Sequence, residues 1–283
     1  MRRTLGQGGY RPPIVTTADF IGLQPTDDPL TWRLPITKLM TTARGALYGG
    51  SGLAAVIAAL EVTTGRPLVW ATAQYLSFVR MPATLDVRLH LPVVGARTTQ
   101  ARGTVWHGDD EILTVLATLG HRDEHAHWTY AEPPEVPRPD ETRRQVVAEA
   151  EGTIHDVLDM RIVRGVSRRQ LLRGKPHVES GGRAAYWVRL PGGRHVPDAA
   201  ELALVGDLVP SAFPQATGEP ISGSSLDNTI RTGELVATEW VLADVQVHAV
   251  VDGYGHGIAH LWSEDGTLLG TASQSAFVRR PDR

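Results

Sequence analysis

The sequence GYGHGIAHLWSEDGTLLGTASQSAFVRR, from Gly253 to Arg280, has the pattern of two strands joined by a turn. In the second strand, every other residue from Leu268 is small or apolar, and the exception is Gln274. Because successive strand residues point to opposite faces of a sheet, this amide is predicted to lie among buried side chains. A buried amide without a partner costs about 1 to 3 kcal/mol, so Gln274 needs hydrogen-bond partners, either structurally or as part of a site.

The first half of the chain contains one helix pattern without a polar face. Residues Gly52 to Val62 (GLAAVIAALEV) follow Ser51, a candidate N-cap, and stop at Thr63-Thr64-Gly65. A helix that is apolar on nearly every side is predicted to be buried. The strand patterns around it are Trp32 to Ile36, Leu68 to Phe78, Leu85 to Val94, Gln100 to Trp106 and Ile112 to Leu119. We expect one buried helix against mostly antiparallel strands.

A proline-rich segment, Ala131 to Asp140 (AEPPEVPRPD), divides the chain nearly in half. It is typical of a linker, and a short solvated helix is predicted after it, from Glu141 to Ala150. Asp198 and Glu201 then have the spacing of a capping box, and the helical region continues through Leu204 to Ala212. Further strands are predicted at Val157 to Val163, Ala184 to Leu190, Ser225 to Ile230, Glu234 to Val251, Gly257 to Trp262 and Leu268 to Val278, with a basic loop from Ser167 to Gly182.

The two halves have the same order of predicted elements. Trp106 and Trp262 are 156 positions apart, and the same offset relates Ile112-Leu113 to Leu268-Leu269. We therefore predict a duplicated fold, with an N-terminal unit over residues 1–132, a linker with a short helix over 133–152, and a C-terminal unit over 153–283.

At this offset Asp207 lies opposite Ser51, and Gln274 lies opposite Thr118. Asp207 is predicted at a helix start, where the helix dipole favours a carboxylate and where Pro210 is tolerated in the first turn. Alone, Asp207 is interpreted as an N-cap and Gln274 as a bonded core amide. Both polar replacements fall in the same half, and this favours a functional site there.

Four segments together resemble the acyl-CoA thioesterase II family. They are GGSGLAAVIAAL (Gly49 to Leu60), AAYWVRLPGGRHVPDAAELALVGDL (Ala184 to Leu208), SSLDNTI (Ser224 to Ile230) and DGTLLGTASQSAFVR (Asp265 to Arg279). The resemblance implies an α+β double hotdog, in which two tandem hotdog repeats each have a buried helix wrapped by an antiparallel sheet. It places the active site in the C-terminal unit.

In that family an Asp, a Thr or Ser, and a Gln hold a water beside the thioester carbonyl. The resemblance assigns these catalytic roles to Asp207, Ser225 and Gln274; Ser225 replaces the more familiar Thr, and Ser224 is the alternative hydroxyl. A carboxylate can accept a proton from water, and an amide and a hydroxyl can hold that water. Helix-terminal amides near Asp207 are expected to polarise the thioester oxygen. The predicted substrate-binding residues are Gly49, Gly50 and Gly206.

The predicted activity is hydrolysis of fatty acyl-CoA to a free fatty acid and CoA, without a cofactor or metal. The alternative is a non-catalytic protein that binds acyl-CoA or lipid, and the presence of both Asp207 and Gln274 favours the enzyme. The resemblance also implies a homo-oligomer, a dimer of double hotdogs. Arginines are expected to meet the CoA phosphates, with candidates at Arg168, Arg169 and Arg173.

Composition excludes several other classes. The net charge of -3 and the absence of a long basic tract argue against nucleic acid, and a chain with no cysteine has no disulfide or thiolate chemistry. The chain has neither a stretch of about 20 apolar residues nor an apolar run behind Arg2 and Arg3, so we expect no membrane span, no signal peptide and a cytoplasmic protein.

Other site patterns are weaker. No G-x-S-x-G motif is present, and GYGHG lacks the spacing of a dinucleotide-binding loop. His121, Glu124, His125 and His127 could be drawn as a metal site, but they are interpreted as a solvated loop. No histidine occurs from Val196 to Val247, which disfavours hydratase chemistry.

Overall fold

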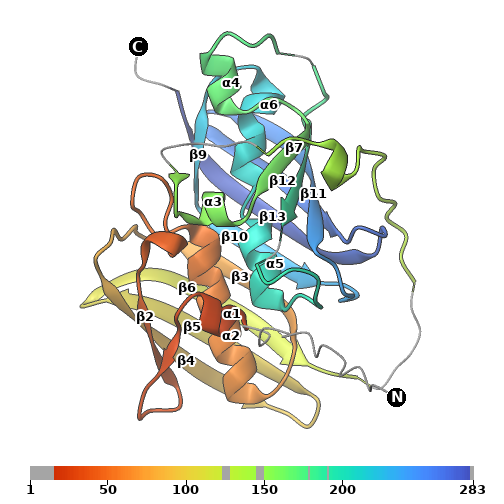
Figure 1. Cartoon of the computed structure of the whole chain (residues 1–283). Helices are drawn as coiled ribbons and strands as arrows, with labels where there is room; N and C mark the ends of the chain where they lie inside the picture. The colour runs from red at the N-terminus through yellow and green to blue at the C-terminus, as the bar shows by residue number, and fades with distance from the viewer. Residues whose placement is uncertain (1–15, 123–127, 145–149, 178, 190, 281–283) are drawn as a thin grey trace, which may run out of the picture.

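The computed structural model describes residues 16–122, 128–144, 150–177, 179–189 and 191–280 (Figure 1). Its main path is an antiparallel sheet in the order β1-β2-β4-β5-β6-β3-β10-β13-β12-β11-β8-β7, and β9 pairs with β13. The strands are β1 (Gln24–Pro25), β2 (Thr31–Pro35), β3 (Leu68–Tyr75), β4 (Thr84–Val94), β5 (Thr98–His107), β6 (Asp110–Gly120), β7 (Met160–Arg164), β8 (Arg183–Arg189), β9 (Ser222–Ser225), β10 (Asp227–Thr232), β11 (Trp240–Val251), β12 (Tyr254–Trp262) and β13 (Leu268–Arg279).

The helices lie mainly on one side of this sheet, in front of it in Figure 1. The α-helices are α1 (Thr17–Phe20), α2 (Gly49–Thr64), α3 (Ile154–Val157), α4 (Arg168–Leu172), α5 (Ala199–Gly206) and α6 (Phe213–Thr217). The 3₁₀ turns are η1 (Lys38–Met40), η2 (Pro139–Glu141) and η4 (Val209–Ala212). In the first half, strands β2-β4-β5-β6-β3 wrap α2, and in the second half β10-β13-β12-β11-β8 repeat the arrangement in mirror order around α5, η4 and α6. The predicted double hotdog is confirmed.

The two halves meet along β3 and β10 and between α2 and α5. Thr72 pairs with Thr229 in the sheet, and their hydroxyls are 2.7 Å apart. In the helix layer, the Tyr48 hydroxyl at the start of α2 donates to the Leu204 carbonyl of α5 at 3.1 Å. The helices come this close because Gly50 has no side chain; a Cβ there would be 2.9 Å from the Ala203 carbonyl oxygen. The sheet and the helix layer are therefore both continuous across the repeat.

The buried helix α2 is longer than the sequence pattern indicates. It begins at Gly49, and its N-cap is Tyr48, so the prediction of Ser51 as the N-cap is wrong. Ser51 lies inside the first turn with its hydroxyl buried. The first turn of α2 needs no local N-cap side chain for one of its backbone N–H groups, because a carboxylate of the second half, described below, accepts that hydrogen bond. The sequence pattern could not show this distant partner. Gly65 ends the helix in the left-handed conformation, as predicted.

Most predicted strands are present, and several differ in where they begin or end. The strand predicted from Val157 begins at Met160 because Ile154–Val157 forms α3. The strand predicted from Ser225 is interrupted at Leu226, so that Ser225 ends β9 and the rest forms β10. The strand predicted from Glu234 begins at Trp240. The sequence predicts a helix from Glu141 to Ala150. In the structure Glu141 ends a 3₁₀ turn and the next three residues are not helical. Residues 145–149 lie outside the described part of the chain.

The linker packs on part of the outer face of the second half. Trp187, Trp240 and Trp262 form a small apolar cluster there with Ala185 and Leu242, and Ala131 and Val136 of the linker pack against it. The Trp187 indole donates to the Pro137 carbonyl at 2.9 Å. The linker is therefore a packed layer over this part of the sheet.

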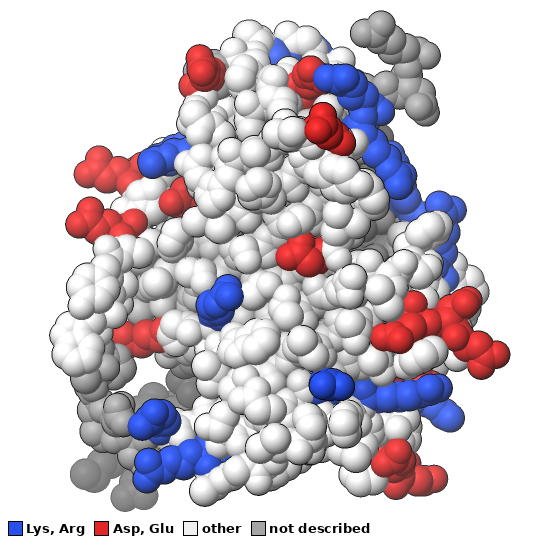
Figure 2. All heavy atoms as spheres, turned by 180° about the vertical axis from the view of Figure 1, so that it is seen from behind, with Lys and Arg blue, Asp and Glu red and all other residues white. Residues whose placement is uncertain are grey.

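The back of the molecule carries few charges. Figure 2 shows it from behind, with scattered Lys, Arg, Asp and Glu side chains over a surface that is mostly uncharged. Along its upper right edge, Lys and Arg side chains follow one another in a short run. None of the described helices is long and apolar enough to cross a membrane. Glu124, His125 and His127, considered above as metal ligands, fall outside the described residues.

Candidate active site

Asp207, Ser225 and Gln274 lie together in the structure. Asp207 follows the last residue of α5, Ser225 ends β9, and Gln274 lies on the inner face of β13. The Gln274 Nε2 group donates to Asp207 Oδ1 and to Ser225 Oγ, the latter at 2.8 Å. The Ser225 hydroxyl in turn donates to Asp207 Oδ1 at 3.3 Å. One carboxylate oxygen therefore receives two side-chain hydrogen bonds.

Strand pairing explains why Ser225, and not its neighbour, takes part. Ser225 lies opposite Ala276 in β13, so it shares the inner face with Gln274, two residues away. Ser224 lies opposite Phe277 and is exposed. The alternative hydroxyl therefore points away from the cluster.

The other carboxylate oxygen is bound by the first half of the chain. The backbone N–H of Gly50, in the first turn of α2, donates to Asp207 Oδ2 at 2.6 Å. The prediction that Asp207 starts its own helix is wrong, because α5 ends just before it and the following 3₁₀ turn has Leu208 as its N-cap. Its charge is still favoured by a helix N-terminus, but by that of α2. The Gly50 amide thus binds the carboxylate, and a role of Gly50 in substrate binding stays a prediction.

The other two predicted glycines permit close packing around this carboxylate. A Cβ on Gly49 would lie 2.8 Å from Asp207 Oδ2, and a Cβ on Gly206 would lie 3.0 Å from the Ala272 methyl group. Any larger residue at these positions would displace Asp207 or separate α5 from β13. A role of these glycines in substrate binding stays a prediction.

The site is almost closed to solvent. Asp207 is 6% exposed and Gln274 is 2% exposed. Burial raises the pKa of Asp207 to about 6, and the hydrogen bonds from Gln274, Gly50 and Ser225 oppose this rise. At neutral pH the carboxylate is thus mainly ionised but close to its pKa, which suits a group that accepts and returns a proton.

One polar atom of the cluster has no partner. Gln274 Oε1 is buried and accepts no hydrogen bond from any described residue, while the Nε2 group of the same amide is fully used. Leaving a buried carbonyl oxygen without a donor costs about 1 to 3 kcal/mol. The site is therefore suited to a small ligand that donates a hydrogen bond to Oε1.

The equivalent position in the first half is different. Thr118, the counterpart of Gln274, donates to Gln100 Oε1 at 2.8 Å within the sheet. Ser51, the counterpart of Asp207, has a buried hydroxyl without a partner. The described residues therefore offer no carboxylate at this equivalent position.

Sequence reasoning missed two neighbours of the cluster, Tyr75 and Asn228. The Tyr75 hydroxyl lies 3.1 Å from the point where a Gly49 Cβ would be, and Asn228 is buried in β10 next to it. A signal was present, because Ala71, Ala73 and Tyr75 alternate on one face of β3 and Tyr75 alone in that row has a polar group.

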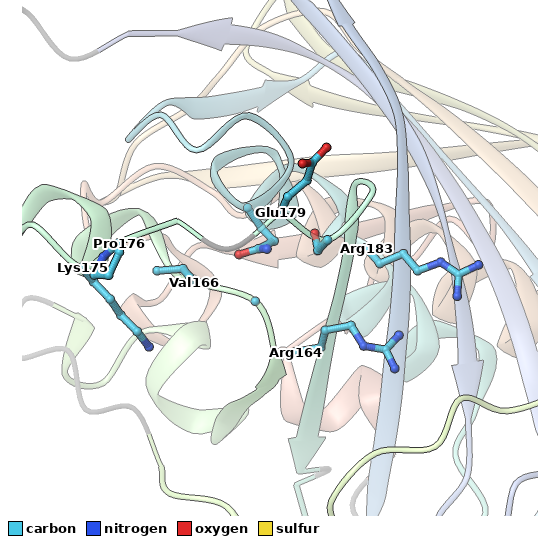
Figure 3. Close-up of a pocket in the computed structure, with 9 residues that line it drawn as sticks. Arg164, Val166, Lys175, Pro176, Glu179 and Arg183 are labelled. Carbon is cyan, nitrogen blue, oxygen red and sulfur yellow. The ribbon is translucent and has the colours of Figure 1, made fainter.

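The two cavities described in the structure lie elsewhere. The larger, about 540 Å³, is lined by Arg164, Gly165, Val166, Lys175, Pro176, Glu179, Ser180, Arg183 and Gln215 (Figure 3). Figure 3 shows Arg164 and Arg183 extending to one side and Lys175 to the other, so their charges do not converge. The second cavity, about 460 Å³, lies beside the linker. Neither is lined by Asp207, Ser225 or Gln274.

Two hotdog repeats with a buried carboxylate, amide and hydroxyl at their junction define this protein as a double-hotdog protein with a buried polar cluster. Residues 131–278, just over half of the chain, match the family described as acyl-CoA thioesterase C-terminal domain. The chain belongs to this acyl-CoA thioesterase family.

Solved structures share the fold over nearly the whole chain. A protein of Novosphingobium aromaticivorans described as a thioesterase is 26% identical, with a TM-score of 0.79 over 91% of this chain and 98% of that one. A hot dog fold protein of unknown function from Alicyclobacillus acidocaldarius is 18% identical, with a TM-score of 0.77 over 94% and 98%. The acyl-CoA thioesterase II of Mycobacterium marinum is 14% identical, with a TM-score of 0.68 over 94% and 99%. The last two show the fold alone. No curated protein matches the chain.

Proposed function

We propose that this protein hydrolyses fatty acyl-CoA thioesters to a free fatty acid and CoA, using a water held by Asp207, Gln274 and Ser225. The observation that carries the proposal is the bond from the Gln274 amide to the buried Asp207 carboxylate, which leaves Gln274 Oε1 as the unpartnered acceptor of the site. The family match supports an acyl-CoA substrate. The resemblance also leads us to expect a homo-oligomer.

In this mechanism one hydrogen of the water is donated to Gln274 Oε1 and the other to Asp207. The water oxygen adds to the thioester carbonyl carbon while Asp207 takes its proton, and the carbonyl π electrons move to the oxygen. The tetrahedral intermediate then collapses, the carbon–sulfur bond breaks, and the proton on Asp207 passes to the thiolate of CoA. Ser225 completes the network that holds this water, because its hydroxyl accepts from Gln274 and donates to Asp207.

A second candidate is a protein that binds acyl-CoA or lipid without turnover. It is favoured by one observation: the site is almost fully buried, and neither described cavity is lined by it.

The test is an assay of free thiol release by the purified full chain with short, medium and long acyl-CoAs. Asp207→Asn is expected to lower kcat by about 10²- to 10⁴-fold, the usual contribution of a general base. Ser225→Ala should also be slower, while Ser224→Ala, one residue along and exposed, should match the wild type. Binding of CoA esters by folded wild type without thiol release would favour the second candidate. An active Asp207→Asn enzyme would mean that the site is elsewhere.

A further inference from the structure

The hydroxyl of Tyr75 is a buried donor beside the carboxylate of the site. Tyr75 ends β3, and its hydroxyl has no hydrogen-bond partner within normal distance among the described residues. The position of a Cβ on Gly49 would be 3.1 Å from this hydroxyl and 2.8 Å from Asp207 Oδ2. The phenol and the carboxylate thus converge on the same glycine at the start of α2.

Asn228 lies next to this hydroxyl on the same inner face. It is opposite Ala73 in the sheet, two residues from Tyr75, and it is completely buried. Neither atom of its carboxamide has a partner of normal hydrogen-bond geometry among the described residues, but the carboxamide lies close enough to the Tyr75 hydroxyl to affect its pKa. On its other side β10 pairs with β13, where Thr229 lies opposite Ser273. Asn228 and Gln274 are the next residues in the two antiparallel strands and therefore lie beside each other. Tyr75, Asn228 and Gln274 therefore line one polar wall.

The donors of the cluster are almost all in use. The Gly50 amide, the Ser225 hydroxyl and the Gln274 amide hydrogens already point at Asp207 or at each other. Addition of water to a thioester creates an oxyanion, and that charge needs hydrogen-bond donors placed in advance. Among the described side chains of this wall, only Tyr75 and Asn228 have donors without a partner.

The phenol is suited to this task at neutral pH. Burial raises the pKa of Tyr75 well above its ordinary value, and the nearby charge of Asp207 raises it further. The adjacent Asn228 carboxamide lowers this pKa, but by less. Tyr75 therefore keeps its proton and can donate it in a hydrogen bond.

We propose that the Tyr75 hydroxyl donates a hydrogen bond to the oxyanion formed at the thioester carbonyl, and that Asn228 positions this hydroxyl. The inference rests on the proposed hydrolysis. When the water oxygen bonds to the carbonyl carbon, the charge on the former carbonyl oxygen is stabilised by Tyr75. The charge returns to a C=O double bond as the carbon–sulfur bond breaks, and Tyr75 neither gains nor loses its proton.

The test compares two tyrosines with buried hydroxyls by single-residue changes. Tyr75→Phe is expected to lower kcat by about 10²- to 10³-fold with little change in KM, as for loss of one oxyanion donor. The melting temperature should stay the same or rise, because the lost hydroxyl has no partner in the protein. Tyr48→Phe is the matched control: that hydroxyl bonds the Leu204 carbonyl, so its loss should lower the melting temperature and leave kcat unchanged. Asn228→Leu should lower kcat by a smaller factor.

The outcomes separate the two proposals. If wild type hydrolyses acyl-CoA and Tyr75→Phe keeps kcat within about threefold, the inference is overturned while the proposed function stands. A lower melting temperature together with an unchanged kcat would make Tyr75 a structural residue and also overturn it. If the wild type releases no thiol, the proposed function fails and this inference fails with it.

Discussion

Asp207 combines two conditions that oppose each other. Burial removes the carboxylate from water, and this favours its protonated form. Three donors, from Gln274, Gly50 and Ser225, favour the ionised form. The balance leaves the pKa at about 6, above the ordinary value of 3.8. Because only the ionised form can take a proton from water, activity should depend on pH in this range.

The predicted pH profile follows from this direction. As pH rises through about 6, Asp207 loses its proton and kcat/KM should increase and then level off. The measurement is kcat/KM from pH 4.5 to 8.5 on one acyl-CoA. In Asp207→Asn the residual rate should have no such limb. A wild-type limb centred near 4, or one that persists in Asp207→Asn, would assign the base to another group.

The sequence reached part of this site. Gln274, Asp207 and Ser225 were found from strand alternation, the repeat and the family resemblance, and the structure brings them together. The bond from Gly50 was not foreseen, because it joins residues 157 positions apart and depends on which end of α2 meets α5. Residue patterns give the faces of elements, but not the contacts between the ends of two distant helices.

At the scale of elements, α2 and α5 also bring carboxyl groups together at the end away from Asp207. Glu61 of α2 accepts from the Leu68 backbone N–H at 2.8 Å. Burial raises the pKa of Glu61 to about 7, the hydrogen bond from Leu68 opposes this, and the charge of Asp198 at the start of α5 adds to the rise. An ionised Glu61 therefore destabilises the fold.

We predict that Glu61→Gln increases stability in a pH-dependent way. The raised pKa means that ionisation of Glu61 weakens the wild type as pH rises from about 4.5 to 7, whereas Gln keeps the Leu68 hydrogen bond without a charge. Melting temperatures should show an advantage for Gln at pH 8 that shrinks at pH 4.5. Exposed Glu132→Gln is the control and should give the same small difference at both pH values. An equal effect of Glu61→Gln at the two pH values would contradict the prediction.

At the scale of the whole molecule, the repeat offset anticipated the architecture well. The strands β4 and β11 begin at Thr84 and Trp240, and β5 and β12 at Thr98 and Tyr254, each pair separated by the predicted 156 positions. The offset could not show that the two sheets join edge to edge, because β3 and β10 carry similar alternating patterns whether paired or exposed. Nor could it show how the linker packs, since its contact with the tryptophan cluster lies outside any periodic element.

The proposed boundaries, residues 1–132 and 153–283, can be tested by dividing the chain. Residues 1–132 alone would expose the β3 edge that pairs with β10 and the face of α2 that packs on α5. We expect this fragment to aggregate when expressed alone, because an unpaired strand edge associates with other edges. Co-expression with residues 133–283 should restore a soluble, hydrolytic complex, measured by size-exclusion chromatography and thiol release. A monomeric, cooperatively melting 1–132 fragment would show that the halves fold independently.

The tryptophan cluster under the linker gives the molecule an optical asymmetry. The chain has seven tryptophans, and those buried among the described residues are Trp187, Trp240 and Trp262, all in the second half. We expect these shielded indoles to emit at shorter wavelength than the more exposed indoles of the first half. The short-wavelength part of the intrinsic fluorescence should therefore report on the half that contains Asp207, Ser225 and Gln274, and release of the linker should shift that part to longer wavelength without any added label.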